Sequence, residues 1–401
     1  MDSPPTGLPL SATRETATSS DIDTLTLTGG HLVTPEGPVD GWVRISDGII
    51  SEFGTGPPPA TPLVDVGGHW IVPGFVDIHC HGGGGGSFTS LDVDQARTAV
   101  ATHRSHGTTT LLASLVTAPP AELAEQISSL SDLVTEGALA GIHLEGPFLS
   151  AAHCGAHDPA LLRPPDLRVI DRLLAAGRGA VRMMTLAPEL ENSVPAISLL
   201  AEHGVLAAIG HTGASIDQVL AAVEAGATVA THLFNGMPPL HHRAPGPVGA
   251  LLTDERITVE LICDLVHLHP ATVELAAKHV GASRTVAVTD SISATAAGDG
   301  TYELGTRTVT VSEGEPRSAD GALAGSTLTM DTALRNLVTR CGMTITEAVL
   351  ACSTTPATLL GLSGSVGALR PGLAADLVVL DAELRPRRIM KDGSWIPGVG
   401  G

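Results

Sequence analysis

Continuous apolar segments alternate with segments of helical spacing between residues 71 and 290. The apolar segments predict strands at 71–78, 108–115, 138–144, 180–186, 205–210, 228–233, 256–262 and 285–290. Helical spacing predicts intervening helices, for example at 92–105, 120–135, 191–203, 215–225 and 270–279. Strands that are apolar on both faces are typical of a parallel sheet covered by helices. Eight such strands alternating with helices predict an α/β fold, a (β/α)8 TIM-type barrel.

Both ends of the chain carry shorter alternating segments separated by glycine and proline, which predict small antiparallel strands. We therefore expect a small β-sandwich domain built from both termini, with residues 23–70 as its first part and 367–401 as its second. The catalytic barrel spans 71–366 in this interpretation. The segment near 300–324 breaks the strand–helix alternation and predicts an inserted hairpin. The Pro-, Ser- and Thr-rich residues 1–22 predict a flexible N-terminal tail without a targeting signal.

The charge balance restricts the partners that this chain can have. It contains 22 Lys and Arg against 42 Asp and Glu, a net charge of −20, and aromatic residues make up only 2%. A surface this acidic argues against nucleic acid and anionic membranes, and few aromatic rings are available to stack on bases. No apolar run reaches the ~18–20 residues of a membrane-spanning helix. Five scattered cysteines favour a reducing cytoplasm over a disulfide framework.

Side chains that can bind a metal follow several of the predicted strands. They end strands one, three, five, six and eight, and they are His79, His81, Glu145, His211, His232 and Asp290. The chemistry of a TIM-type barrel lies at the C-terminal ends of its strands. With 17 histidines in the chain, each position alone is also explained by a solvated strand end. Their joint placement favours a transition-metal site.

The motifs DIHCHGG, HLEGPF, GHT, THLFNGM, VTD and LAGSTLTM occur in this order along the chain. With them the chain resembles the N-acetylglucosamine-6-phosphate deacetylases of the amidohydrolase superfamily, from about residue 25 to 395. HLEGPF with THLFNGM is fairly specific to this family, whereas the His-x-His pair alone marks only the superfamily. The segment GALRPGLAADLVVLD is similar to the superfamily's return into its small β domain. The resemblance implies a metal-dependent enzyme that removes acetate from the 2-amino group of a phosphorylated sugar.

The resemblance also implies which residues do the chemistry. The residues expected to hold the principal metal are Glu145, His211 and His232. Asp290 matches the family's catalytic aspartate, the acid/base that moves a proton to the departing amine. His79 and His81 match a pair that only some members retain, so one or two divalent transition metals per chain are expected. Zinc is expected first, with iron, manganese or cobalt as alternatives.

The number of lysines adds an independent constraint on a two-metal site. Many binuclear amidohydrolases bridge their metals with a carboxylated lysine at a strand end. This chain has only two lysines, Lys278 in a helical segment and Lys391 in the terminal β segment. If two metals bind, Glu145 is therefore the expected bridge.

Substrate contacts follow from the same resemblance. In CGAHDP, which is similar to a family loop with a Lys-Gly-Ala-His pattern, His157 would polarise the acetyl carbonyl or bind the sugar. Cys154 replaces the usual lysine, so a charge at that position is in doubt. Arg243 in HHRAPG matches the family's phosphate arginine and His267 its second phosphate contact, although Leu265 stands where a glycine is usual. The other expected contacts are Ala156, Asn235, Gly236, Leu323 and Gly325.

In the family, phosphate contacts can cross a subunit interface, which implies a homodimer acting on a small amino-sugar phosphate. Two other functions stay open. One is an amidohydrolase for a cyclic amide or for another N-acetylated amino-sugar phosphate, such as N-acetylgalactosamine 6-phosphate. The other is a sugar-phosphate-binding homologue without catalysis. The absence of a barrel lysine and the presence of LEGPF and HHRAPG count against a cyclic amide, and the full set of ligand types with Asp290 counts against lost catalysis.

Overall fold

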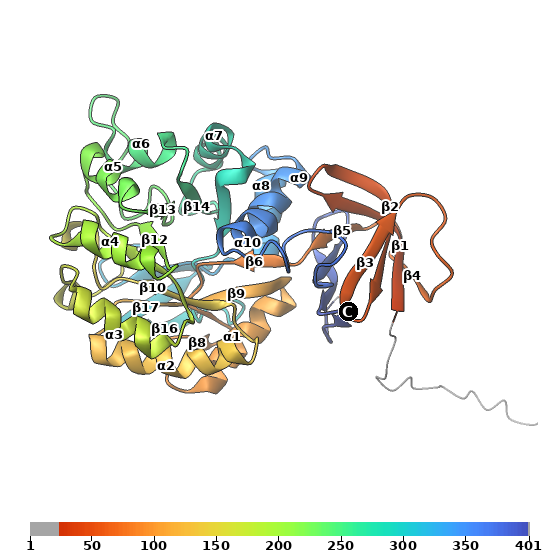
Figure 1. Cartoon of the computed structure of the whole chain (residues 1–401), viewed down its shortest axis with the longest axis horizontal. Helices are drawn as coiled ribbons and strands as arrows, with labels where there is room; N and C mark the ends of the chain where they lie inside the picture. The colour runs from red at the N-terminus through yellow and green to blue at the C-terminus, as the bar shows by residue number, and fades with distance from the viewer. Residues whose placement is uncertain (1–23, 400–401) are drawn as a thin grey trace, which may run out of the picture.

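The structure is a computed structural model that describes residues 24–399, so the tail predicted at 1–22 lies outside the described residues. Figure 1 shows a barrel ringed by helices and, beside it, a smaller sheet that contains strands from both ends of the chain. The fold class expected from the sequence is thereby confirmed. Within residues 24–399, no helix is long and apolar enough to cross a membrane.

The barrel sheet has the strand order β15-β14-β13-β12-β11-β10-β9-β6, and neighbouring strands run parallel. The bounds are β6 Phe75–Asp77, β9 Thr108–Leu115, β10 Gly141–Glu145, β11 Val181–Leu186, β12 Leu206–Ile209, β13 Ala227–Ala230, β14 Thr258–Ile262 and β15 Thr285–Val288. Beyond β6 and β15 the chain segments also pair. Asp290 N–H donates to the His79 carbonyl (2.8 Å) and His81 N–H to the Ser291 carbonyl (2.7 Å), which nearly closes the barrel.

Helices cover the outside of the barrel (Figure 1). They are α1 Val93–Ser105, α2 Pro120–Thr135, α3 Leu167–Gly177, α4 Ser193–Glu202, α5 Ile216–Glu224, α6 Gly246–Thr253, α7 Pro270–Val280, α8 Met330–Thr339, α9 Ile345–Val349 and α10 Thr355–Leu359. Local sequence explains where several begin. The Asp92 side chain caps α1, and Ser215 with Gln218 forms a capping box at α5. The bounds of α2 coincide with the predicted 120–135.

The smaller sheet has the order β21-β20-β19-β5-β1-β2-β3, with β4 paired to β1. Its strands are β1 Thr24–Thr34, β2 Gly37–Ser46, β3 Ile49–Gly54, β4 Leu63–Asp65, β5 Trp70–Pro73, β19 Leu377–Leu380, β20 Pro386–Lys391 and β21 Ser394–Trp395. The antiparallel pairing of β5 with β19 joins the two ends of the chain. Residues from both ends also share one buried apolar cluster, which includes Leu27, Val43 and Leu377.

The strand predicted at 71–78 is divided between the two sheets at Gly74. Residues 70–73 form β5 of the smaller sheet, and residues 75–77 form β6 of the barrel. A Cβ at Gly74 would lie 2.9 Å from the Cβ of Thr109 and closer still to its Oγ1 and Cγ2. Glycine is therefore required where the backbone passes Thr109. The apolar pattern continues across this point, so it did not mark the change of sheet between 70 and 78.

The segment predicted as an inserted hairpin forms a three-stranded antiparallel sheet. Its strands are β16 Gly300–Leu304, β17 Arg307–Ser312 and β18 Glu315–Ser318. The third strand is short and contains a proline, so its sequence lacks the alternation that predicts strands. A buried apolar cluster fixes this sheet to the barrel mouth, where Leu304, Val309 and Val311 pack with Val116 and Ile292.

We expect Gly74→Ala to destabilise the protein by about 1–3 kcal/mol, because the new methyl group overlaps Thr109 in a closely packed junction. Gly364→Ala is the matched control, since a Cβ there has nothing within 4 Å. Thermal unfolding followed by circular dichroism should show a lower Tm for Gly74→Ala alone. Equal Tm values for both variants would show that the junction can absorb the methyl group.

Candidate active site

Each expected metal ligand, and the expected acid/base Asp290, lies at the C-terminal end of a barrel strand. His79 and His81 follow β6, Glu145 ends β10, His211 follows β12, His232 follows β13 and Asp290 follows β15. Three of them have positive φ angles, 48° at His211, 27° at His232 and 51° at Asp290. Such backbone costs non-glycine residues roughly 1–3 kcal/mol each and is concentrated at functional sites. All three of these residues line the same pocket.

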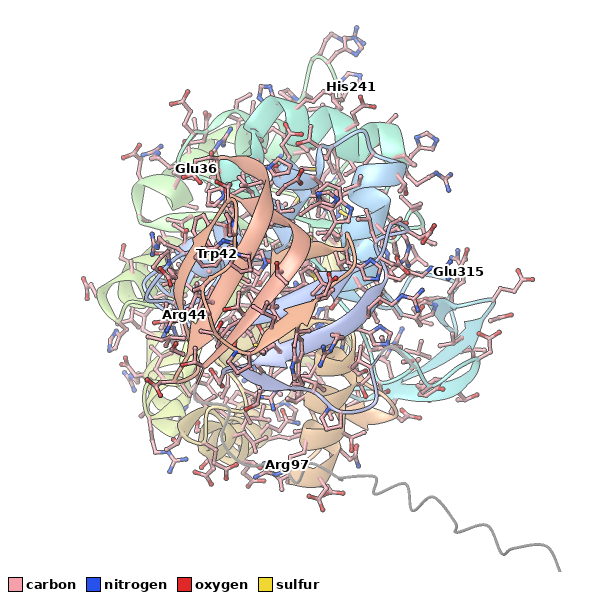
Figure 2. All side chains as sticks on the ribbon, turned by 90° about the vertical axis from the view of Figure 1, so that its right-hand side faces the viewer. Glu36, Trp42, Arg44, Arg97, His241 and Glu315 are labelled. Carbon is pink, nitrogen blue, oxygen red and sulfur yellow. The ribbon has the colours of Figure 1, made fainter. Side chains whose placement is uncertain are left out.

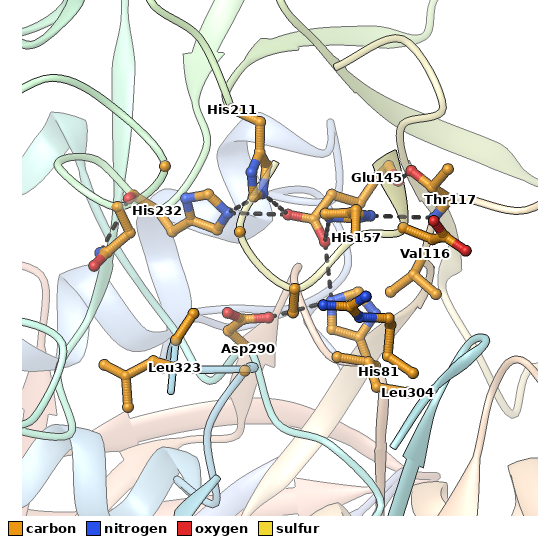
Figure 3. A pocket seen from close by; sticks show the side chains of 18 of the residues that line it. His81, Val116, Thr117, Glu145, His157, His211, His232, Asp290, Leu304 and Leu323 are labelled. Atoms are coloured by element: carbon orange, nitrogen blue, oxygen red, sulfur yellow. Dashed lines mark hydrogen bonds and ion pairs between the residues drawn. The ribbon is translucent and has the colours of Figure 1, made fainter. Parts of the chain in front are cut away.

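The Glu145 carboxylate divides the surrounding histidines into two sets, as Figure 3 shows in part. Its Oε1 lies 3.1 Å from His211 Nε2 and 2.9 Å from His232 Nε2. Its Oε2 lies 3.3 Å from His81 Nε2 and 3.6 Å from His79 Nε2. Glu145 is therefore placed to bridge two neighbouring positions, one formed with His211 and His232 and the other with His79 and His81.

The spacing of these atoms fits metal binding. His211 Nε2 and His232 Nε2 are 3.1 Å apart, and His79 Nε2 and His81 Nε2 are 3.2 Å apart. Metal–nitrogen bonds of about 2.0–2.1 Å place adjacent ligands about 2.9–3.4 Å from one another, for octahedral and tetrahedral geometry respectively. Asp290 Oδ1 completes the second set, 3.2 Å from His81 Nε2 and 3.5 Å from His79 Nε2.

For His81, His211 and His79, a contact on Nδ1 fixes which ring nitrogen is free, whereas Nδ1 of His232 has no hydrogen-bond partner within residues 24–399. His211 Nδ1 donates to the His153 carbonyl (2.8 Å), and His81 Nδ1 donates to the Ser114 carbonyl (3.1 Å). Neither acceptor can donate, so each Nδ1 carries the proton and each Nε2 keeps its lone pair for a metal. His79 Nδ1 similarly contacts Glu260 Oε2 at 3.1 Å.

His157 has the opposite arrangement. The backbone N–H of Thr117 donates to His157 Nδ1 at 3.4 Å, so the proton of a neutral His157 is on Nε2. Nε2 faces Glu145 Oε2 at 3.4 Å. Burial lowers the pKa of His157 and outweighs the opposing effect of the Glu145 carboxylate. His157 is thus a neutral N–H donor at the site, although its position alone would also suit a ligand.

Beneath the ligands, a chain of buried side-chain hydrogen bonds crosses the barrel. Ser114 Oγ contacts His143 Nδ1 (2.9 Å), His143 Nε2 contacts Thr185 Oγ1 (2.8 Å), and Thr185 contacts Thr231 (2.8 Å). Burial is the main reason that the pKa of His143 lies well below its ordinary value, so this histidine is neutral. The interior of the barrel is polar here, and the chain of bonds satisfies its polar atoms.

The Asp290 carboxylate lies at the floor of a pocket in the barrel mouth. Burial would raise the pKa of Asp290, but the adjacent His79 and His81 lower it below its ordinary value. The pocket also contains most of the expected substrate contacts, namely Ala156, His157, Asn235, Gly236, His267, Leu323 and Gly325.

Arg243 is the exception among the expected contacts. It does not line the pocket of its own chain, and its guanidinium instead contacts His242 Nε2 (2.8 Å) on an exposed loop. Figure 2 shows His241, two residues away, at the tip of a loop that stands out from the body of the molecule. Arg243 therefore lies on an exposed loop outside the pocket of its own chain, and its contact with the substrate phosphate stays a prediction.

A profile of the amidohydrolase family matches residues 70–396 of the chain. The chain belongs to the amidohydrolase family.

Relatives of known activity cover nearly the whole of this amidohydrolase. The N-acetylgalactosamine-6-phosphate deacetylase of Escherichia coli O157:H7 is 36% identical over 374 residues, covering 92% of this chain and 97% of that protein. The N-acetylglucosamine-6-phosphate deacetylase of Danio rerio is 40% identical over 349 residues, covering 83% and 86%. A solved structure of the Mycobacterium smegmatis N-acetyl-D-glucosamine-6-phosphate deacetylase, an aspartate-to-alanine mutant in complex with N-acetyl-D-glucosamine-6-phosphate, superposes with a TM-score of 0.89. It is 45% identical and covers 93% of this chain and 98% of its own.

Both lysines of this amidohydrolase lie outside the pocket. Lys278 is on α7, where it pairs with Glu274 (2.6 Å), and Lys391 is on β20, where it pairs with Asp376 (3.0 Å). Neither lysine is therefore placed to bridge two metals in this pocket, and the Glu145 bridge stays a prediction.

Two further residues of the site were not predicted from the sequence. Glu260 on β14 contacts His79. In the sequence it is marked only by being a charged residue inside the apolar segment 256–262. Arg307 begins β17. Among the described residues that line this pocket, it is the only arginine or lysine. The inserted sheet brings it there, so no motif near the strand ends could have identified it.

We expect between one and two transition-metal ions per purified chain. His211→Ala should lose more metal than His79→Ala, because His211 belongs to the set expected to hold the principal metal. Elemental analysis of both variants and of the wild type, prepared side by side, measures this. Equal metal loss from the two variants, or an active enzyme without metal, would contradict the assignment.

Proposed function

We propose that the chain hydrolyses the acetamide of N-acetylglucosamine 6-phosphate to glucosamine 6-phosphate and acetate. The observation that carries this proposal is the placement of Asp290 and the neutral donor His157 around Glu145, inside a pocket lined by most of the expected substrate contacts. The named activities of the relatives, at up to 45% identity over nearly the full length, support the same substrate class.

Glu145, His211 and His232 would hold the principal metal, and His79 and His81 with Glu145 a second one. When bound, a divalent transition metal lowers the pKa of water to about 7 and polarises a carbonyl oxygen. The mixed imidazole and carboxylate ligands suit zinc, which we propose first, and also iron, manganese and cobalt.

Asp290 accepts the proton of the attacking water and then donates it to the amine nitrogen as the C–N bond breaks. An amine leaves poorly unless it is protonated, so this transfer is required, and a positioned acid/base typically contributes ~10²–10⁴ in rate. His157 donates its Nε2–H to the acetyl carbonyl oxygen, where negative charge develops in the transition state. Its Nδ1 contact with Thr117 N–H keeps this proton on the correct nitrogen.

Phosphate would be bound on the side of the pocket formed by Asn235, Gly236 and His267. His267 donates from Nδ1 to Asp264 Oδ2 at 2.7 Å. Burial would lower the pKa of His267, but the Asp264 carboxylate raises it above its ordinary value. A protonated His267 would attract the phosphate against the net charge of −20.

Arg243 would reach the phosphate of a second copy of the chain in a homodimer. The loop that carries Arg243 is exposed, so this side chain is accessible to a second copy of the chain. The five cysteines are unpaired, which supports a cytoplasmic location.

N-acetylgalactosamine 6-phosphate is the second candidate substrate. It is favoured by the Escherichia coli relative, which this chain matches over 92% of its own length. The experiment that tests the proposal is acetate release from phosphorylated and unphosphorylated N-acetylglucosamine and N-acetylgalactosamine, with metal analysis of the same sample. Release that is fastest from N-acetylglucosamine 6-phosphate supports it, and release from none of the four overturns it.

We expect Asp290→Asn to fold and to bind sugar phosphate, but to lose ~10² or more in kcat, because the amide cannot accept the proton. Steady-state kinetics give kcat, and calorimetry gives the affinity for the product glucosamine 6-phosphate. A kcat within a few-fold of the wild type would mean that another group moves the proton.

We expect Arg243→Ala to reduce kcat/KM by about one to two decades for the 6-phosphate and to change it little for the unphosphorylated sugar. Charge-assisted hydrogen bonds contribute roughly 1.5–3 kcal/mol, which supports this magnitude. Arg256→Ala is the control, since Arg256 pairs with Asp254 and Glu224 and does not line the pocket. Equal losses on both sugars would mean that Arg243 only supports its loop.

Mixed dimers test whether Arg243 acts across an interface. When Arg243→Ala chains are mixed with Asp290→Asn chains, one pocket of each mixed dimer combines an intact Asp290 with an intact Arg243 from its partner. Activity on the 6-phosphate should then exceed the sum of the two separate variants. If a sample shown to contain mixed dimers gains no activity, Arg243 does not act across the interface.

A further inference from the structure

Glu260 is a fully buried carboxylate in the barrel interior, on β14. Burial of an ionised carboxylate is unfavourable unless hydrogen bonds or opposite charge compensate it. An apolar residue would fill this strand position at no such cost, so the contacts of Glu260 indicate its purpose.

One oxygen of Glu260 serves both sets of expected metal ligands. Its Oε2 accepts from His79 Nδ1 at 3.1 Å and from the backbone N–H of His232 at 3.1 Å. The Glu260 carbonyl also accepts from the N–H of Leu233 at 2.9 Å. Within residues 24–399, Oε1 of Glu260 has no hydrogen-bond partner, so the side chain is committed to these two contacts.

The contact with His79 differs from those of the other expected ligands. His81 and His211 donate from Nδ1 to neutral backbone carbonyls, whereas His79 donates to a carboxylate. A carboxylate behind an imidazole fixes its tautomer and orientation and makes its free nitrogen a stronger metal ligand. The set formed by His79 and His81 thus receives additional support from a residue that touches no metal position itself.

The contact with His232 stabilises a strained turn. His232 has a φ of 27°, and its N–H and that of Leu233 both donate to Glu260. The same residue therefore holds the backbone that presents His232 on one side of Glu145 and the ring of His79 on the other.

We propose that Glu260 is a positioning residue that orients His79 for the metal position at His79 and His81. This inference rests on the metal sites of the proposed function. It is tested by metal binding, so a failed deacetylase assay would overturn the proposed function without changing this result.

The experiment is calorimetric titration of the metal-free protein with Zn²⁺ in the presence of a competing chelator. Wild type should bind two equivalents. Glu260→Gln should keep the first and bind the second about 10–100-fold more weakly, the usual effect of losing such a support. Circular dichroism checks the fold, and Glu260→Asp, which keeps the charge, replaces Glu260→Gln if the latter does not fold.

A double-mutant cycle with His79→Ala separates positioning from general damage to the core. If Glu260 acts through His79, adding Glu260→Gln to His79→Ala should cause no further loss of the second equivalent. Two equivalents bound by Glu260→Gln with wild-type affinity would overturn the proposal. The proposal would also be overturned if Glu260→Gln weakened binding of the second equivalent as much in His79→Ala as it does in the wild type.

Discussion

The buried carboxylate of Glu145 is the interaction on which the rest of the site depends. It lies at the end of β10, and its two oxygens contact imidazoles from three other places around the barrel. A charge buried to this extent is tolerated only where partners surround it closely. The barrel therefore has to close until residues after β6, β12 and β13 come within about 3–3.6 Å of one side chain. The strained turns at His211 and His232 are a consequence of that requirement.

Backbone hydrogen bonds fix the position of the proton on three histidines of the site. His81 and His211 give their Nδ1 protons to backbone carbonyls and keep Nε2 free, while His157 accepts from the backbone and keeps its proton on Nε2. Identical side chains within a few ångströms thus present either a lone pair or a proton to the site, according to one backbone contact each. Metal binding and polarisation of the substrate need opposite tautomers, so these contacts matter as much as the distances.

The barrel, and the meeting of histidine and carboxylate side chains at its mouth, could be predicted because both depend on strand ends, which an apolar pattern marks directly. Other features depend on tertiary structure. Gly74 lies inside an unbroken apolar segment, and only the packing against Thr109 reveals that the chain changes sheets there. Arg243 follows a strand in sequence, yet it lies on an exposed loop and does not line the pocket of its own chain, because loop direction is not fixed by the strand before it. Arg307 enters the pocket from an inserted sheet whose docking onto Val116 leaves no local sequence signal.

The pairing of β5 with β19 has a consequence for how the protein is made. Pro73 lies opposite Leu377, so 303 residues lie between the two partners in the sequence. During synthesis, β5 leaves the ribosome long before β19 exists, and its hydrogen-bonding edge stays open while the barrel is assembled. Open edges are where chains associate wrongly, and domains generally fold from the N-terminus as they emerge. Completion of the smaller sheet is therefore a late step that can occur only after the last barrel helix has been translated.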